Sequence, residues 1–152
     1  MTHDLLESNR KPIHSPEKAL AEAEKTAFQK LAFGTRAILS GTYRSKGVKK
    51  AGARYRELRQ NASDKYDFGV LQLNSMGYEL LRNGDTKGAV EIFRLNIEQF
   101  PTDANVDASL GEAYLKQGDK ALAVENYEKS LDLNPQNENA RGVLKKLEVS
   151  NQ

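Results

Sequence analysis

A pattern of 34 residues that occurs twice decides the fold of this chain. Residues 70–103 read VLQLNSMGYELLRNGDTKGAVEIFRLNIEQFPTD, and residues 104–137 read ANVDASLGEAYLKQGDKALAVENYEKSLDLNPQN. A fixed period of this length predicts an array of helical repeats. The recurring structural positions hold small, aromatic or proline residues, and they are Gly77, Ala89, Phe93 and Pro101 in the first copy and Gly111, Ala123, Tyr127 and Pro135 in the second.

Each copy has the local signals of two antiparallel helices joined by a tight turn. Residues 83–85 (Asn-Gly-Asp) match residues 117–119 (Gln-Gly-Asp). Glycine enters the left-handed conformation that ends a helix at little cost, and aspartate accepts backbone N–H bonds at the start of the next helix. Gly77 and Gly111 lie inside the first helices, where glycine costs about 1 kcal/mol relative to alanine. We therefore expect a neighbouring helix to approach closely at both glycines.

Apolar residues recur at intervals of three and four in both copies, which predicts helices with one buried face. We expect Phe93 and Tyr127 to fill the space between successive helix pairs, with Ala89 and Ala123 as small neighbours. The two prolines should end the second helices. The recurring apolar residues are Leu73, Met76, Leu80, Leu81, Val90 and Ile97 in the first copy, and Leu110, Tyr114, Leu115, Leu122, Val124 and Leu131 in the second.

The glycine, alanine, aromatic and proline positions resemble those of the tetratricopeptide repeat (TPR), a family of helical arrays whose members bind other proteins. The resemblance implies an all-α fold, a right-handed α-solenoid of antiparallel helix pairs that ends in a C-terminal capping helix. It also implies a function as a non-enzymatic protein–protein interaction module, an adaptor or scaffold that binds a peptide or partner protein in a concave groove.

In the family, the second, fifth, ninth and twelfth residues of each first helix line that groove, and their spacing keeps them on one helical face. Asparagine can bond to a peptide backbone, while tyrosine and leucine can hold an apolar side chain. An alternative is that Leu71 and Leu115 pack against the N-terminal helix or a second copy of the chain. Carried onto this sequence, the groove residues are Leu71, Asn74, Tyr78, Leu81, Asn105, Ala108, Glu112 and Leu115, with Asn139 and Lys146 as additions from the last helix.

The chain divides into three sections. Residues 1–14 lack periodicity and predict a mobile tail. Residues 15–67 predict a helical region that begins at Ser15-Pro16 and contains a degenerate repeat, because Lys46-Gly47 resembles the later turns and Ala51 and Tyr55 have the spacing of Ala89 and Phe93. Residues 68–152 hold the two repeats, 70–103 and 104–137, and a capping helix at 138–149.

Residues 46–148 are similar to the repeat extension found C-terminal to bacterial serine hydrolases of the β-lactamase-like and esterase-like type. The residues that carry this similarity are 55–58, 64–68 and 73–81. The similarity implies a bacterial source and, as an alternative function, an accessory or detached C-terminal region of such an enzyme without catalytic residues of its own.

The hydrolase's own motifs argue against catalysis by this chain. Ser15 and Lys18 have the spacing of a Ser-x-x-Lys motif, but Pro16 makes Ser15 a helix cap. The sequence contains no Ser-Asp-Asn, Lys-Thr-Gly or Gly-x-Ser-x-Gly element. We therefore expect no catalytic residue and a protein that is not an enzyme.

Composition argues against several other classes of function. The chain has no cysteine, and its two histidines, His3 and His14, lie in the predicted tail. We therefore expect no metal site and no cofactor. No apolar stretch is long enough to span a membrane, and residues 1–15 lack the apolar core of a secretory signal, which favours a cytoplasmic location.

Charge is unevenly distributed along the chain, whose net charge is +2. Residues 1–67 hold more bases than acids, and residues 68–152 hold more acids than bases. This asymmetry suggests head-to-tail homo-oligomers or an anionic partner for residues 44–59. That basic run also fits a solvated helix face or, less well because aromatic residues are few, a nucleic-acid site. Its bases are Arg44, Lys46, Lys49, Lys50, Arg54, Arg56 and Arg59.

Overall fold

The computed structural model describes residues 18–21 and 34–149 of the protein. These residues are helical apart from short connections, and they contain no strand, so the predicted all-α fold is confirmed. The predicted tail and the helix start at Ser15 lie outside the described residues. The helices are α2 (Thr35–Asn61), α3 (Val70–Arg82), α4 (Thr86–Gln99), α5 (Ala104–Gln117), α6 (Lys120–Leu133) and α7 (Glu138–Val149).

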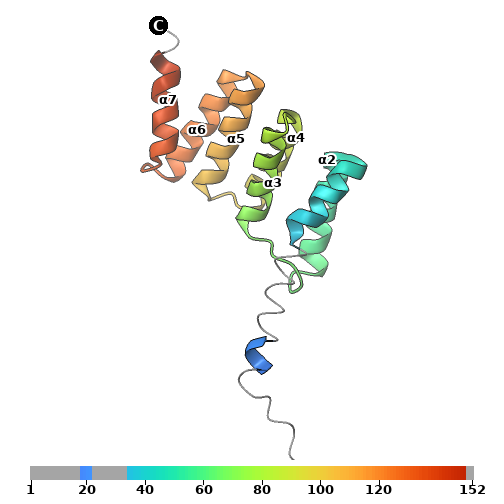
Figure 1. Ribbon diagram of the computed structural model, residues 1–152. Coiled ribbons are helices and arrows are strands. Elements are labelled where there is room, and N and C mark those ends of the chain that lie inside the picture. The colour runs from blue at the N-terminus through green and yellow to red at the C-terminus, as the bar shows by residue number, and fades with distance from the viewer. Residues whose placement is uncertain (1–17, 22–33, 150–152) are drawn as a thin grey trace, which may run out of the picture.

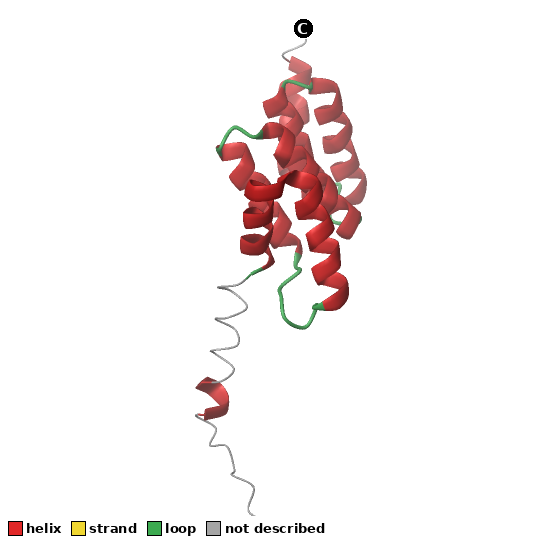
Figure 2. Cartoon of the chain, turned by 90° about the vertical axis from the view of Figure 1, so that its right-hand side faces the viewer, coloured by secondary structure: helices red, strands yellow, loops and turns green. Residues whose placement is uncertain are grey.

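The helices stack side by side in the order of the sequence (Figure 1). α3 pairs with α4 and α5 pairs with α6, and each pair contacts the next. The turns within the pairs lie along one long edge of the stack, and the loops between pairs lie along the opposite edge. Figure 2, a view from the side, shows the same stack as an array of antiparallel helices.

Helix α2 is broken at Gly47, which has φ 80° and ψ 173°. The chain changes direction there, and the two halves of α2 form a first pair beside α3 and α4 (Figure 1). Leu39 from one half and Tyr55 from the other belong to the same buried cluster. We propose, as the sequence indicates, that α2 is the degenerate repeat. The exit loop follows Asn61, where α2 ends.

The ends of the helices follow from the residues at the turns. Gly84 and Gly118 have φ of 82° and 91°, the left-handed region that glycine enters at little cost. The carboxylate of Asp85 accepts a bond from the N–H of Gly88 (2.9 Å), and that of Asp119 accepts one from the N–H of Leu122 (3.0 Å). Both aspartates therefore cap the second helix of their pair.

Each proline of the repeats lies just beyond the second helix of its pair. α4 ends at Gln99 and α6 at Leu133, two residues before Pro101 and Pro135. The intervening residues, Phe100 and Asn134, have φ of −135° and −140°. Proline disfavours the helical conformation of the residue before it, so the helices end one residue earlier than the prolines alone would require.

The helical glycines make room for aromatic rings. A Cβ atom on Gly77 would lie only 2.5 Å from Cζ of Phe93, and one on Gly111 would lie 3.0 Å from the ring of Tyr127. We expected close approach of a neighbouring helix, and at Gly77 the nearest neighbour is the Phe93 ring rather than backbone. Each ring thus packs over the glycine of its own pair, a fit that any side chain at the glycine would obstruct.

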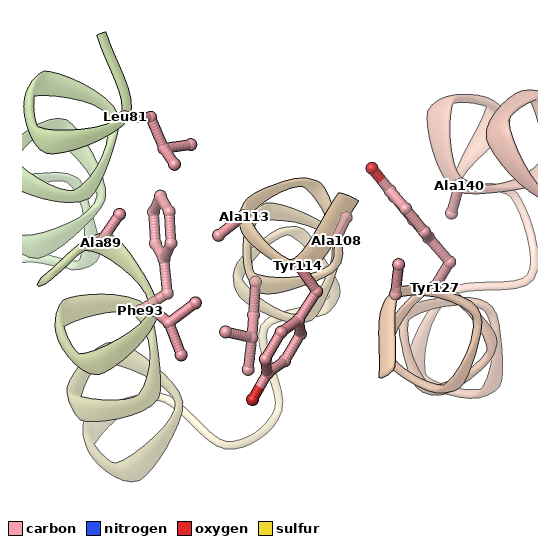
Figure 3. Packing of buried hydrophobic residues seen from close by; sticks show 11 residues of the cluster. Leu81, Ala89, Phe93, Ala108, Ala113, Tyr114, Tyr127 and Ala140 are labelled. Carbon is pink, nitrogen blue, oxygen red and sulfur yellow. The ribbon is translucent and has the colours of Figure 1, made fainter. Parts of the chain in front are cut away.

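These rings belong to a core that continues from pair to pair. Figure 3 shows Phe93 between Leu81 and the helix that carries Ala113, and Tyr127 between the helix that carries Ala108 and Ala140 of α7. A second buried cluster joins α2 to α3 and α4, and it contains Leu39 and Tyr55 of α2, Met76 of α3 and Ile92 of α4. The half-buried Leu80 packs against both clusters, so the apolar core runs through the whole described stack.

Buried polar side chains form a hydrogen bond between the two helices of each pair, at the edge opposite the turn. The side-chain amide of Asn96 donates to the carbonyl oxygen of Val70 (3.2 Å), and the hydroxyl of Ser130 donates to that of Ala104 (2.7 Å). Asn96 and Ser130 occupy the same position in the two copies, and so do Val70 and Ala104. The last turn of each second helix is therefore bonded to the first residue of its partner helix.

Candidate partner-binding groove

The groove residues of the first copy lie on α3. Leu71, Asn74 and Tyr78 follow one another at intervals of three and four residues, so they share one face of the helix. Leu71 is 68% exposed, whereas Asn74 and Tyr78 are half-buried. Leu81 is only 7% exposed and packs in the core beside Phe93, so it offers little surface to a partner.

The groove residues of the second copy lie on α5, beside those of α3. Asn105 is exposed, and Glu112 and Leu115 are half-buried. Leu115 packs against the same core cluster as Leu81. Ala108 is only 5% exposed, and a partner could reach little of it.

A hydrogen-bonded group joins the two helices across this face. The hydroxyl of Tyr78 donates to Oε2 of Glu112 (3.1 Å) and lies 3.2 Å from Oγ of Ser109. The Ser109 hydroxyl itself donates to the carbonyl of Asn105 (2.8 Å). Burial, more than the neighbouring Glu112, raises the pKa of Tyr78, so its hydroxyl stays protonated and available as a donor at neutral pH.

One acceptor on the same face lacks a donor. Among the described residues, none donates a hydrogen bond to the buried Oδ1 of Asn74. An unsatisfied buried acceptor costs free energy, so a donor that reached it after a small rotation of the side chain would bind favourably. Asn74 thus combines an unused acceptor with a position next to the exposed Leu71.

A pocket of about 260 Å³ lies between α2 and α3, and the repeat pattern did not predict it. Tyr43, Met76 and Leu80 form its apolar part, and the Tyr43 hydroxyl donates to the carboxylate of Asp85. Burial, reinforced by that bond, raises the pKa of Tyr43 to about 12. The only signal in the sequence was Tyr43 on the apolar face of its helix, because the partner of that face depends on how α2 bends.

The basic run at 44–59 divides into two parts. Arg56 pairs with Glu98 (2.5 Å), Arg54 pairs with Glu57 (2.8 Å), and Arg59 donates to Gln99 (2.6 Å). By contrast, no acid or acceptor among the described residues pairs with three exposed lysines of the run, which are Lys46, Lys49 and Lys50. Arg56 and Arg59 therefore join α2 to α4, Arg54 is paired within α2, and the lysines stay free for solvent or a ligand.

Neither a metal-binding cluster nor a membrane-spanning helix is found among the described residues. They contain no group of three or more His, Cys, Asp or Glu side chains that could hold a metal ion, and none of their helices is long and apolar enough to cross a bilayer. His3, His14 and Ser15 lie outside the described residues.

The stack of antiparallel helix pairs defines the chain as an α-solenoid repeat protein. The tetratricopeptide repeat family model matches residues 108–137, and the recurring pattern extends the same arrangement over α3 and α4. This chain therefore contains a tetratricopeptide repeat at residues 108–137. The presence of such a repeat supports the interpretation of the chain as a protein–protein interaction module. Repeats of this family are typically non-catalytic.

Among solved structures, the fold is similar to the N-terminal domain of stress-induced protein-1 (STI-1) from C. elegans. The similarity has a TM-score of 0.50 and 19% sequence identity, and it covers 82% of this chain and 95% of that chain. At this identity the similarity shows the fold alone. No curated protein matches the chain, and neither the matching family nor the similar structure is a serine hydrolase.

Proposed function

We propose that this protein is a non-enzymatic adaptor that binds an extended segment of a partner protein across α3 and α5. The observation that carries the proposal is the pairing of the exposed Leu71 with the unpartnered Oδ1 of Asn74 on one face of α3. Leucine provides an apolar contact, and the asparagine amide can bond to a peptide backbone of any sequence.

The residues around this pair support an extended ligand. Asn105 is exposed on α5 at one end of the face, and Tyr78 and Glu112 hold α3 and α5 together in its middle. A rigid face reduces the ordering cost of binding, because the helices do not need to move. An extended segment that crosses both helices would contact Leu71 and Asn74 on one and Asn105 on the other.

The experiment starts from the full chain, which is used to select binders from a random peptide phage library. The affinity of a selected peptide is then measured by isothermal titration calorimetry for three proteins: wild type, a Leu71→Ser/Asn74→Ala groove variant, and a Lys129→Ala/Leu133→Ser control. Leu133 matches Leu71 as an exposed leucine, at 44% exposure, but it lies on α6. All three should have the same circular dichroism spectrum.

We expect the groove variant to bind at least about tenfold more weakly, since truncating a central interface residue costs more than about 1 kcal/mol. The control should bind as wild type does. Equal affinity for wild type and the groove variant, or an equal loss in the control, would place the binding surface elsewhere and refute the proposal.

A further inference from the structure

The edge of the stack that holds the turns is strongly basic. We define the turn edge as residues 44–50, 82–87 and 116–120, which lie side by side along one side of the molecule (Figure 1). Two aspartates are the only acids in these segments. The bases are all exposed, and they are Arg44, Lys46, Lys49, Lys50, Arg82, Lys87, Lys116 and Lys120.

The two aspartates of the turn edge offset only two of these eight positive charges. Asp85 accepts bonds from the N–H of Gly88 and from the Tyr43 hydroxyl, and Asp119 accepts one from the N–H of Leu122. Both carboxylates therefore face the positive ends of helices. The end of α7 reaches the same edge (Figure 1) and adds Lys145 and Lys146 next to Glu148.

Helix stability accounts for only some of these bases. Arg82 and Lys116 lie in the last turns of α3 and α5, where a positive charge is favourable. Lys87 and Lys120, however, lie in the first turns of α4 and α6, where the helix dipole disfavours a positive charge and where both helices lack an acid. Lys49 and Lys50 repeat this placement just after the break at Gly47. The stability of the individual helices therefore does not explain why all three pairs have a lysine in the first turn after the bend.

The opposite edge has the opposite charge. The loops at 62–69 and 100–103 hold Asp64, Asp67 and Asp103 against a single base, Lys65. A net charge of only +2 thus conceals two edges of opposite sign. A large anionic surface would attract the turn edge and repel the loop edge, and it would fix the orientation of the molecule.

We propose that the turn edge docks on the surface of an anionic lipid membrane. Three turns at one edge carry exposed lysines (Figure 1), and clusters of four to eight bases are of the size that binds anionic lipids. Beside the first turn, Lys46, Lys50 and Arg54 border a shallow hollow of about 370 Å³, large enough for a phosphate headgroup. The acid in its lining, Glu57, is paired with Arg54.

Nucleic acid fits this edge less well. Proteins that bind single strands stack bases on aromatic side chains, but the turn-edge segments contain no aromatic residue. The neighbouring Tyr43 is half-buried and bonded to Asp85. The sequence pI of about 8.7 is also below the value typical of nucleic-acid-binding domains.

The test measures sedimentation of the full chain with vesicles of phosphatidylcholine alone and with about 30% phosphatidylserine, at low and at physiological salt. The turn-edge variant is Lys49→Gln/Lys87→Gln/Lys120→Gln, which removes bases that do not stabilise their helices. The control, Lys65→Gln/Lys129→Gln/Arg141→Gln, changes the net charge equally but away from the turn edge.

We expect wild type and control to bind the anionic vesicles, and the turn-edge variant to have a partition coefficient lower by roughly 100-fold. Binding should weaken as salt rises and be negligible with phosphatidylcholine alone. Absence of binding by wild type, or an equal loss in variant and control, overturns the proposal. Tighter binding to duplex DNA at equal phosphate concentration also overturns it, because the edge would then bind nucleic acid. So does wild-type self-association that the turn-edge variant abolishes, because the edge would then bind a second copy of the chain.

Discussion

Replacement of Gly77 by alanine tests the packing of the repeats most directly, because helix propensity and packing predict opposite results. Gly77 lies inside α3, where alanine is favoured over glycine by about 1 kcal/mol. The added methyl would, however, lie 2.5 Å from Cζ and 2.8 Å from Cδ1 of Phe93. The ring is fully buried and packs edge-on against Tyr78, at 5.3 Å between centroids, so it has little room to move.

Overpacking of a core by one methyl costs about 1–3 kcal/mol. At Gly77 we expect the upper part of that range, because the close atoms belong to a rigid ring rather than to the end of a flexible chain. After subtraction of the propensity gain, Gly77→Ala should destabilise the protein by about 1–2 kcal/mol. This corresponds to a fall of about 2–8 °C in Tm for a chain of this size.

Gly142 provides the matched control. It lies inside α7, and, apart from the nearby backbone of its own helix, no atom comes within 4 Å of the position its Cβ would take. Gly142→Ala should therefore stabilise the protein by about 1 kcal/mol. Both variants are compared with wild type by urea unfolding, followed by circular dichroism at 222 nm. The chain has no tryptophan, and tyrosine fluorescence supplies a second probe.

A double-mutant cycle with Phe93→Leu isolates the contact. Gly77→Ala should cost less free energy in the Phe93→Leu background than in wild type, because the smaller side chain leaves space for the methyl. If Gly77→Ala raised the unfolding midpoint as much as Gly142→Ala does, the argument that the Phe93 ring requires a glycine would be wrong.

Three further predictions concern buried residues. Phe93→Ala should cost about 3–5 kcal/mol of unfolding free energy, and an unchanged thermal midpoint would contradict the role of this ring. Burial raises the pKa of the Asp107 carboxyl, so its ionised form opposes folding, and Asp107→Asn should raise Tm at pH 7 but not below about pH 4. Burial also raises the pKa of Tyr127 to about 12. The free energy of unfolding should therefore be unaffected by this residue below pH 10 and should fall as pH rises from 10 through 12. Unfolding measured across this range should show a smaller fall for Tyr127→Phe than for wild type.

Much of the fold could be predicted because the repeat places strong local signals at a fixed spacing. The predicted start of each copy, Val70 or Ala104, is the first residue of a first helix, and the predicted capping helix begins at Glu138. Gly84 and Gly118 have the left-handed backbone expected of them. These features depend on residues close in sequence, whose conformational preferences act locally.

Features that depend on the relative placement of helices could not be predicted in the same way. The pattern assigned Leu81 and Ala108 to the groove by position, and packing in the core buries both. The packing of Tyr43 over Gly88 and its bond to Asp85 require the bend of α2 at Gly47, which no repeat spacing specifies. Exposure of a side chain depends on the next element in space, and periodicity defines only the face that it occupies.

The bonds from Asn96 to Val70 and from Ser130 to Ala104 affect how the pairs can open. The polypeptide chain links two paired helices at one end only, so the other end could separate through small rotations about the turn. A side-chain bond at that free end makes each pair a closed loop, linked covalently at the turn and by hydrogen bonding at the far end. Local opening must then break the buried bond first, and the amide protons of both helices should exchange with solvent at similar, slow rates instead of progressively faster toward the free end.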